Sequence, residues 1–206
     1  MNSDASYYVQ VLLLYVDKLT KKLVSWYKHL LQLKPVDTVK IHENLAAANL
    51  RRGTYDSAIS HLQKVTEADP ENAEAYYSLG IAYQHAGSLE NAIESFKKAI
   101  ESQAEYAEAY YNLGIAYADS DDMLDESLHC FERAIELDPQ NADAHYRLGV
   151  ANDKQGSYNE AVSCFQQAIE LSPRVARYHK MLGYTYESLD EHKESVECFK
   201  RAMELE

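Results

Sequence analysis

The stretch AEAYYSLGIAYQHAGSLENAIESFKKAIESQAEY, residues 73–106, decides the fold, because residue 107 begins the same pattern again as AEAYYNLGIAYA. Copies spaced by 34 residues run from residue 39 to residue 206, and later copies begin at Ala142 and Ala176. The copy that starts at residue 107 carries one extra residue in its 119–124 turn. Repetition at this period predicts a solenoid of stacked helix pairs, in which each pair buries its apolar faces against its neighbours.

Small residues recur where the two helices of a pair are expected to cross. The eighth position of a copy holds Gly80, Gly114, Gly149 and Gly183, and the twentieth position holds Ala or Ser. Small residues on both sides let two antiparallel helices approach to about 8–10 Å. Prolines near the end of a copy, at positions 70, 139 and 173, mark where the second helix must stop. We therefore predict an all-α fold.

The repeated positions carry a family resemblance. The seventh position holds Leu45, Leu79, Leu113, Leu148 and Leu182, and the twenty-fourth holds Leu62, Phe96, Phe131, Phe165 and Phe199. This pattern resembles the tetratricopeptide repeat (TPR) family. The resemblance implies an α-solenoid with TPRs at residues 39–72, 73–106, 107–141, 142–175 and 176–206, preceded by a degenerate repeat or docking segment at residues 1–38. Because the chain stops at Glu206, we expect a polar outer face, a missing tail or a partner to close the stack.

Charge is distributed unevenly along the chain. The net charge of the whole chain is −13, which argues against a nucleic-acid partner, because phosphate binding needs a basic surface. Residues 1–38 nevertheless hold five lysines and three aspartates, so this segment is basic. Opposite charges on the segment and on the repeats favour attraction between them or between copies of the chain.

Three cysteines, Cys130, Cys164 and Cys198, recur at equivalent positions of successive copies. Equivalent helices of neighbouring repeats lie about 10 Å apart, beyond the ~7 Å Cα limit for a disulfide. We therefore predict free thiols without a metal, which fits a reducing compartment. The apolar run at residues 7–16 has neither the flanks of a secretory signal nor the length to span a bilayer. A cytoplasmic location is expected.

The amino-terminal segment carries apolar side chains at helical spacing. Its predicted self-association residues are Tyr8, Leu12, Tyr15, Leu19 and Trp26. Three interpretations remain open. The segment is a cap over the first full repeat, an arm that docks in another subunit's groove, or an interfacial helix on an anionic membrane that uses its lysines and Trp26.

A binding groove is expected where the first helices of a TPR stack line its concave face. The family's groove positions hold three tyrosines and three β-branched residues, namely Tyr77, Tyr111, Tyr146, Ile81, Ile115 and Val150. Tyrosine offers a large contact area and a hydroxyl for hydrogen bonding, so a helix or an extended peptide is the expected ligand. The alternative is that these tyrosines merely pack on one another.

Charge also changes sign along the predicted groove. Its early end holds Glu43, Glu74 and Glu108, and its late end holds Arg147, Arg177 and Lys180. TPR co-chaperones that bind the acidic tail of heat-shock chaperones use a clamp of five basic and amide residues. Here Asn112 and Arg147 match that clamp, whereas Tyr77, Ile81 and Asp143 do not. We therefore do not predict that function.

Catalytic motifs are absent from the sequence. It holds no phosphate loop, no zinc-binding HExxH pair and no nucleophile elbow. The acidic turn at residues 119–125 lacks the glycine of a calcium-binding loop at Leu124 and its glutamate at Cys130. We predict a non-enzymatic protein without a cofactor.

Some residues of the last two repeats are not dictated by repeat packing. These are Arg147, Asp153, His179, Glu187 and His192, and with them the chain resembles the magnetosome-associated TPR proteins of magnetotactic bacteria. That resemblance implies a scaffold that self-assembles head-to-tail on the cytoplasmic side of the magnetosome membrane and binds other proteins, which allows indirect membrane association. It pairs residues 1–38 of one copy with the groove of the next. The alternative prediction is a monomeric TPR adaptor that binds a short peptide of a different protein.

Overall fold

The computed structural model describes residues 18–22, 35–119 and 123–206. Four predicted self-association residues, Tyr8, Leu12, Tyr15 and Trp26, lie outside these ranges, as do residues 120–122 of the acidic turn. The chain divides into two compact units, Met1–His42 and Glu43–Glu206. In the first unit, residues 18–22 are helical and exposed, and Leu19 has 49% of its surface in solvent.

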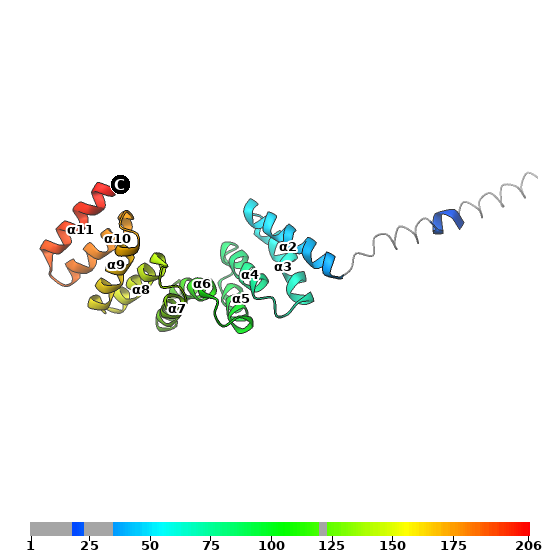
Figure 1. Cartoon of the computed structure of the whole chain (residues 1–206), viewed down its shortest axis with the longest axis horizontal. Coiled ribbons are helices and arrows are strands. Elements are labelled where there is room, and N and C mark those ends of the chain that lie inside the picture. The colour runs from blue at the N-terminus through cyan, green and yellow to red at the C-terminus, as the bar shows by residue number, and fades with distance from the viewer. Residues whose placement is uncertain (1–17, 23–34, 120–122) are drawn as a thin grey trace, which may run out of the picture. The chain divides into compact units, whose positions relative to one another are not determined.

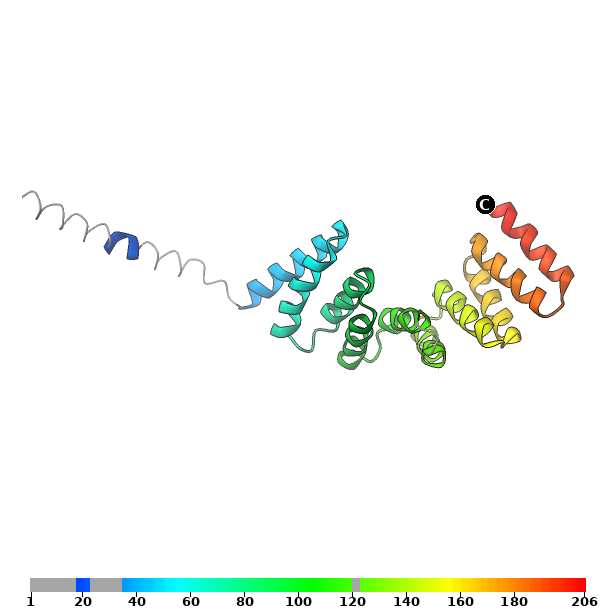
Figure 2. The ribbon, with the colours of Figure 1, turned by 180° about the vertical axis from the view of Figure 1, so that it is seen from behind.

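Helices follow one another along residues 35–119 and 123–206, and the described residues contain no strand (Figures 1 and 2). They are α2 (Pro35–Arg52), α3 (Tyr55–Ala68), α4 (Ala73–His85), α5 (Leu89–Ser102), α6 (Ala107–Ala118), α7 (Leu124–Leu137), α8 (Ala142–Gln155), α9 (Tyr158–Leu171), α10 (Ala176–Ser188) and α11 (His192–Leu205). Each of the helices α4, α6, α8 and α10 packs most extensively on the helix that follows it, and every pair then packs on the next. The predicted all-α solenoid is confirmed.

A glycine and a phenylalanine meet inside each of the last four pairs. A Cβ atom added to Gly80 would lie 2.5 Å from Cε1 of Phe96, and one added to Gly149 would lie 2.7 Å from Cε1 of Phe165. The same contact joins Gly114 to Phe131. The absence of a side chain on each glycine therefore makes room for an aromatic ring, and not only for the small residue at the twentieth position.

The small residue at the twentieth position adds a hydrogen bond in the third repeat. The Ser127 hydroxyl donates to the carbonyl oxygen of Gly114 at 2.9 Å, and Ser127 is fully buried. A buried hydroxyl without a partner would cost stability, so this bond offsets the burial of a polar group between the helices.

The turns inside the pairs require left-handed backbone. Gly156 ends α8 with φ of 83°, a conformation that glycine adopts without steric cost. In the last repeat Asp190 takes the equivalent place with φ of 60°. Aspartate tolerates this region better than most residues, so the turn keeps its form without glycine.

The three cysteines are free, as predicted. Burial raises the pKa of Cys130 and of Cys164 to about 11, so both thiols stay protonated at neutral pH. On α11, Val196 and Met203 are 64% and 69% exposed, and Glu194, Glu197 and Arg201 are exposed too, so this helix presents both apolar and charged side chains to solvent. Within the described ranges, no helix is both long and apolar enough to cross a membrane.

Candidate functional site: a groove lined by first helices

The predicted groove residues lie on four consecutive first helices. They are Tyr77 and Ile81 on α4, Tyr111, Asn112 and Ile115 on α6, Tyr146, Arg147 and Val150 on α8, and Arg177 and Lys180 on α10. Residues four apart share one face of a helix, which sets each tyrosine beside a β-branched residue. These tyrosines and β-branched residues are all half-buried. Helices α4 and α6, α6 and α8, and α8 and α10 also contact each other directly.

Tyr77 is held by its neighbours. Its ring centre lies 5.0 Å from that of Tyr106 and 6.0 Å from that of Phe96. Its hydroxyl accepts a hydrogen bond from Nδ2 of Asn112 at 3.1 Å. Burial raises the pKa of Tyr77, and the charge of Glu108 adds to the effect. A ligand at this end of the groove would meet a ring and a hydroxyl that already have partners.

Tyr146 is covered in a similar way from the following repeat. Its ring stacks on Tyr178, with 5.1 Å between centres, and lies 5.8 Å from Phe165. The guanidinium of Arg177 lies 5.4 Å from the Tyr146 ring centre and 5.3 Å from that of Tyr178. Here the interpretation that groove tyrosines pack on neighbouring side chains accounts for what the structure shows.

Tyr111 differs from the other two. Its ring contacts the ring of Phe131, at 6.1 Å between centres, and Ala144 stands where the next repeat has Tyr178. Within residues 35–119 and 123–206 its hydroxyl makes no hydrogen bond. Tyr111 therefore offers an aromatic ring and a free hydroxyl at the middle of the groove.

Asp143 engages one of the three predicted groove cations. Nη2 of Arg177 and the hydroxyl of Tyr178 both donate to Oδ1 of Asp143. Burial alone would raise the pKa of Asp143, but the bonds from Tyr178 and Arg177 lower it below its usual value. From the sequence alone, Asp143 is identified only as a mismatch to the chaperone clamp. Its spacing of about one repeat from Tyr178 was the available signal for this network.

The other two cations, Arg147 and Lys180, are exposed. Neither forms an ion pair with any residue that the structure describes. Among the predicted groove residues, Tyr111 thus has an unbonded hydroxyl, and Arg147 and Lys180 are exposed without an ion pair to a described residue.

Comparison with known proteins agrees with this architecture. Tetratricopeptide repeat models match residues 43–107, 142–175 and 176–206, and a TPR repeat model matches residues 123–156. A crystal structure of MamA protein is 34% identical to this chain, with 82% of this chain and 92% of that chain covered and a TM-score of 0.77. This chain belongs to the tetratricopeptide repeat family. TPRs bind other proteins or peptides, so the chain is a protein-interaction adaptor.

Other solved TPR structures are also similar. MamA 41-end from Desulfovibrio magneticus RS-1 is 28% identical, with 82% of this chain and 95% of that chain covered and a TM-score of 0.78. YrrB, described as a TPR protein with an unusual peptide-binding site, is 22% identical with a TM-score of 0.73 and shares the fold. None of the curated proteins matches the chain. The predicted resemblance to the magnetosome-associated TPR proteins, of which MamA is one, is confirmed.

Proposed function

We propose that this protein is a non-enzymatic scaffold that self-assembles and recruits other proteins on the cytoplasmic face of the magnetosome membrane. The observation that carries the proposal is the similarity to MamA, the magnetosome-associated TPR protein, at 34% identity over 92% of that chain. Contact with the membrane runs through bound proteins in this proposal.

Self-assembly uses two surfaces of opposite charge. Residues 1–38 are basic in a chain whose net charge is −13, so this segment of one copy is attracted to the repeats of the next. The described part of the segment fits this role, because Lys18 and Leu19 are both exposed. A contact between two different surfaces is heterologous and leaves each copy with a free surface of either kind, so it produces rings or open assemblies.

The groove supplies the receiving surface. Tyr111, Ile115 and Val150 provide apolar contact area at its centre, and Arg147 and Lys180 receive an acidic group toward its late end. The same surface supports the second candidate function, a monomeric adaptor for a short peptide of another protein. The observation that favours the adaptor is the free hydroxyl of Tyr111, which suits a single peptide side chain as well as an arm.

Static light scattering against concentration and salt separates these functions. If the protein is a scaffold, its average mass rises above the monomer mass of 23.5 kDa as the concentration increases at low salt. Added salt moves this rise in mass to a higher concentration. Tyr111→Ala is expected to weaken this growth, whereas Tyr158→Ala, a matched loss of a half-buried tyrosine at the start of α9, leaves it unchanged. A chain that stays monomeric at high concentration and low salt would exclude the scaffold.

A further inference from the structure

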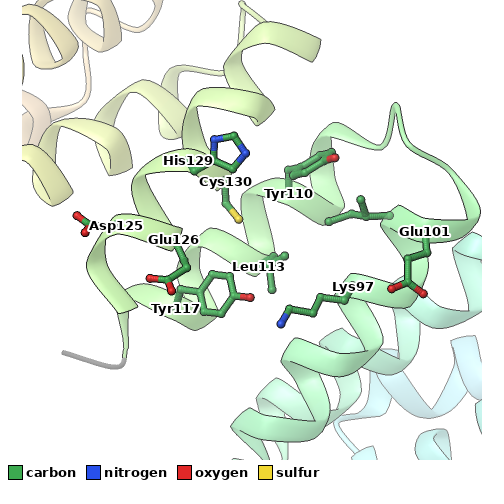
Figure 3. A pocket seen from close by; sticks show the side chains of 10 residues that line it. Lys97, Glu101, Tyr110, Leu113, Tyr117, Asp125, Glu126, His129 and Cys130 are labelled. Atoms are coloured by element: carbon green, nitrogen blue, oxygen red, sulfur yellow. The ribbon is translucent and has the colours of Figure 1, made fainter. Parts of the chain in front are cut away.

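A pocket of about 520 Å³ lies away from the groove residues, on α5, α6 and α7 at the junction of the second and third repeats (Figure 3). Leu113, Tyr117 and Cys130 are buried and form its floor. Pockets that bind ligands or anchoring side chains have volumes of roughly 300–1,000 Å³. This pocket is therefore large enough for one or two bulky side chains of a partner.

The equivalent pocket at the preceding junction, on α3, α4 and α5, is half as large, about 250 Å³. There Nε2 of Gln63 donates to the hydroxyl of Tyr83 at 3.0 Å and joins the two repeats across the groove. An equivalent bond, from Gln166 to Tyr186 at 3.1 Å, joins the last two repeats. Amide bridges of this kind join neighbouring repeats at both junctions.

Lys97 stands where those junctions have glutamine. Its ammonium lies 5.6 Å from the ring centre of Tyr117, and Figure 3 shows the lysine side chain reaching toward Tyr117 from the opposite helix. Lys97 thus contacts the tyrosine equivalent to Tyr83, and the pocket at this junction has about twice the volume of the preceding one.

Other substitutions between the two junctions change the chemistry of the groove. Ile100 and Cys130 take the places of Thr66 and Ser95, which makes the floor more apolar. At the rim, Glu126 takes the place of Asn91, and His129 takes that of Glu94. The more apolar floor is a difference that repeat packing alone does not explain.

Acidic side chains stand at both ends of the pocket. Glu101 lies at one end, and Asp125 and Glu126 lie at the other (Figure 3). Asp125 is held in place by a hydrogen bond from Nε2 of Gln155 at 3.0 Å. These three carboxylates outnumber the two basic side chains that line the pocket, Lys97 and His129, so the rim carries a net negative charge. Charge complementarity therefore selects a partner with basic residues on either side of its apolar anchor.

We propose that this pocket binds a segment of another protein that presents one or two bulky apolar side chains between basic residues. The inference rests on the recruiting role proposed above and assigns it a surface separate from the groove. The assembled chain uses residues 1–38 and the groove for self-association, which leaves the pocket available to the recruited protein. The segment docks as an amphipathic helix or turn, with its anchor over Leu113, Tyr117 and Cys130.

The test uses the full chain and a fluorescent hexapeptide that has leucine and phenylalanine between two pairs of lysines. Fluorescence anisotropy measures its affinity for the wild type and for Glu126→Lys, which reverses one rim charge. Glu160→Lys is the matched control, since Glu160 holds the equivalent exposed position on α9. The proposal predicts at least a tenfold loss of affinity for Glu126→Lys and less than a twofold loss for Glu160→Lys. Equal losses would overturn it, because attraction would then be spread over the acidic surface.

Two further peptides test the anchor and the charge. A peptide with alanines in place of leucine and phenylalanine, and one with glutamates in place of the lysines, are both expected to bind at least tenfold more weakly. Equal binding of either one contradicts the proposal.

Thiol alkylation locates the bound peptide. Iodoacetamide labelling at pH 8.5, followed by mass spectrometry, compares Cys130 in the pocket with Cys164, whose pKa is also raised to about 11 by burial. Saturating peptide is expected to slow labelling of Cys130 at least threefold and to leave Cys164 unchanged. Equal slowing of both thiols would place the peptide elsewhere and overturn the proposal.

Self-association is measured separately. Glu126→Lys is expected to assemble like the wild type in light scattering. Loss of assembly in this variant would identify the occupant as a second copy and overturn the proposal. If the wild type never assembles but Glu126→Lys still weakens peptide binding, the scaffold function is excluded and the pocket proposal stands.

Discussion

Gly80 meets Phe96 in the second repeat just as Gly149 meets Phe165 in the fourth, whereas the grooves at the junctions between repeats differ from one to the next. The interior of a helix pair has one packing solution, so the same residue types recur there. The junctions only need enough contact to hold neighbouring pairs together, and this leaves their exposed positions free to vary. Binding surfaces should therefore be sought at positions that vary from repeat to repeat, such as that of Lys97 and that shared by Ala144 and Tyr178.

The interior contact is expected to give the largest mutational effect. Phe131 is 1% exposed, and Phe131→Ala should lower the free energy of unfolding by about 3–5 kcal/mol, because it removes a buried ring and leaves a cavity. Urea unfolding measures the change. Phe165→Ala should lower the free energy of unfolding by the same amount within error. A clear difference between the two variants would show that the two interiors are not equivalent.

Filling the glycine side of the contact has a smaller effect. In Gly114→Ala the new methyl group would lie 2.8 Å from Cε1 of Phe131, so the ring has to shift. Overpacking of this kind should lower the free energy of unfolding by about 1–3 kcal/mol. In the double variant Gly114→Ala/Phe131→Leu, the added methyl group should cost less unfolding free energy than it costs beside phenylalanine, because leucine leaves it more room. Strictly additive losses would show that the two side chains do not compete for one space.

Much of this interior could be predicted from the sequence, because each of its positions is repeated. The solenoid and the crossing at Gly80 and Gly114 follow from that periodicity, although the ring of Phe96 as the glycine's contact was missed. The groove could be predicted only as a set of positions. Whether a tyrosine is covered depends on single residues one repeat away, such as Tyr178 or Ala144, and the outer pocket depends on Lys97 replacing a glutamine.

Two groove tyrosines, Tyr77 and Tyr111, should respond differently to loss of the hydroxyl. Tyr178→Phe is the reference, since it removes a bond to the charged Asp143 and should cost about 1.5–3 kcal/mol of unfolding free energy. Tyr77→Phe loses the bond from Asn112 and should cost about 0.5–1.5 kcal/mol. Tyr111→Phe should change stability by less than about 0.5 kcal/mol. Thermal unfolding orders the variants, and a large loss for Tyr111→Phe would contradict its assignment as an open side chain.

The smallest expected effect concerns pH. The pKa of Asp143 is lowered in the folded chain by the bonds from Tyr178 and Arg177, so its stabilising contribution is complete above the unfolded value of about 3.9. That contribution is lost as pH falls through the folded pKa. Asp143→Asn should therefore lose less melting temperature than the wild type between pH 5 and pH 2.5. Asp56→Asn, an exposed aspartate at the start of α3, is the control.

Side-chain footprinting with hydroxyl radicals tests most directly whether the groove is a binding surface. The full chain is oxidised at a low concentration, where it is monomeric, and at a high concentration, where it is assembled, and the modified tyrosines are quantified by mass spectrometry. The account predicts that oxidation of Tyr111 falls severalfold on assembly while that of Tyr158 is unchanged. Assembly that leaves Tyr111 as reactive as in the monomer would contradict it.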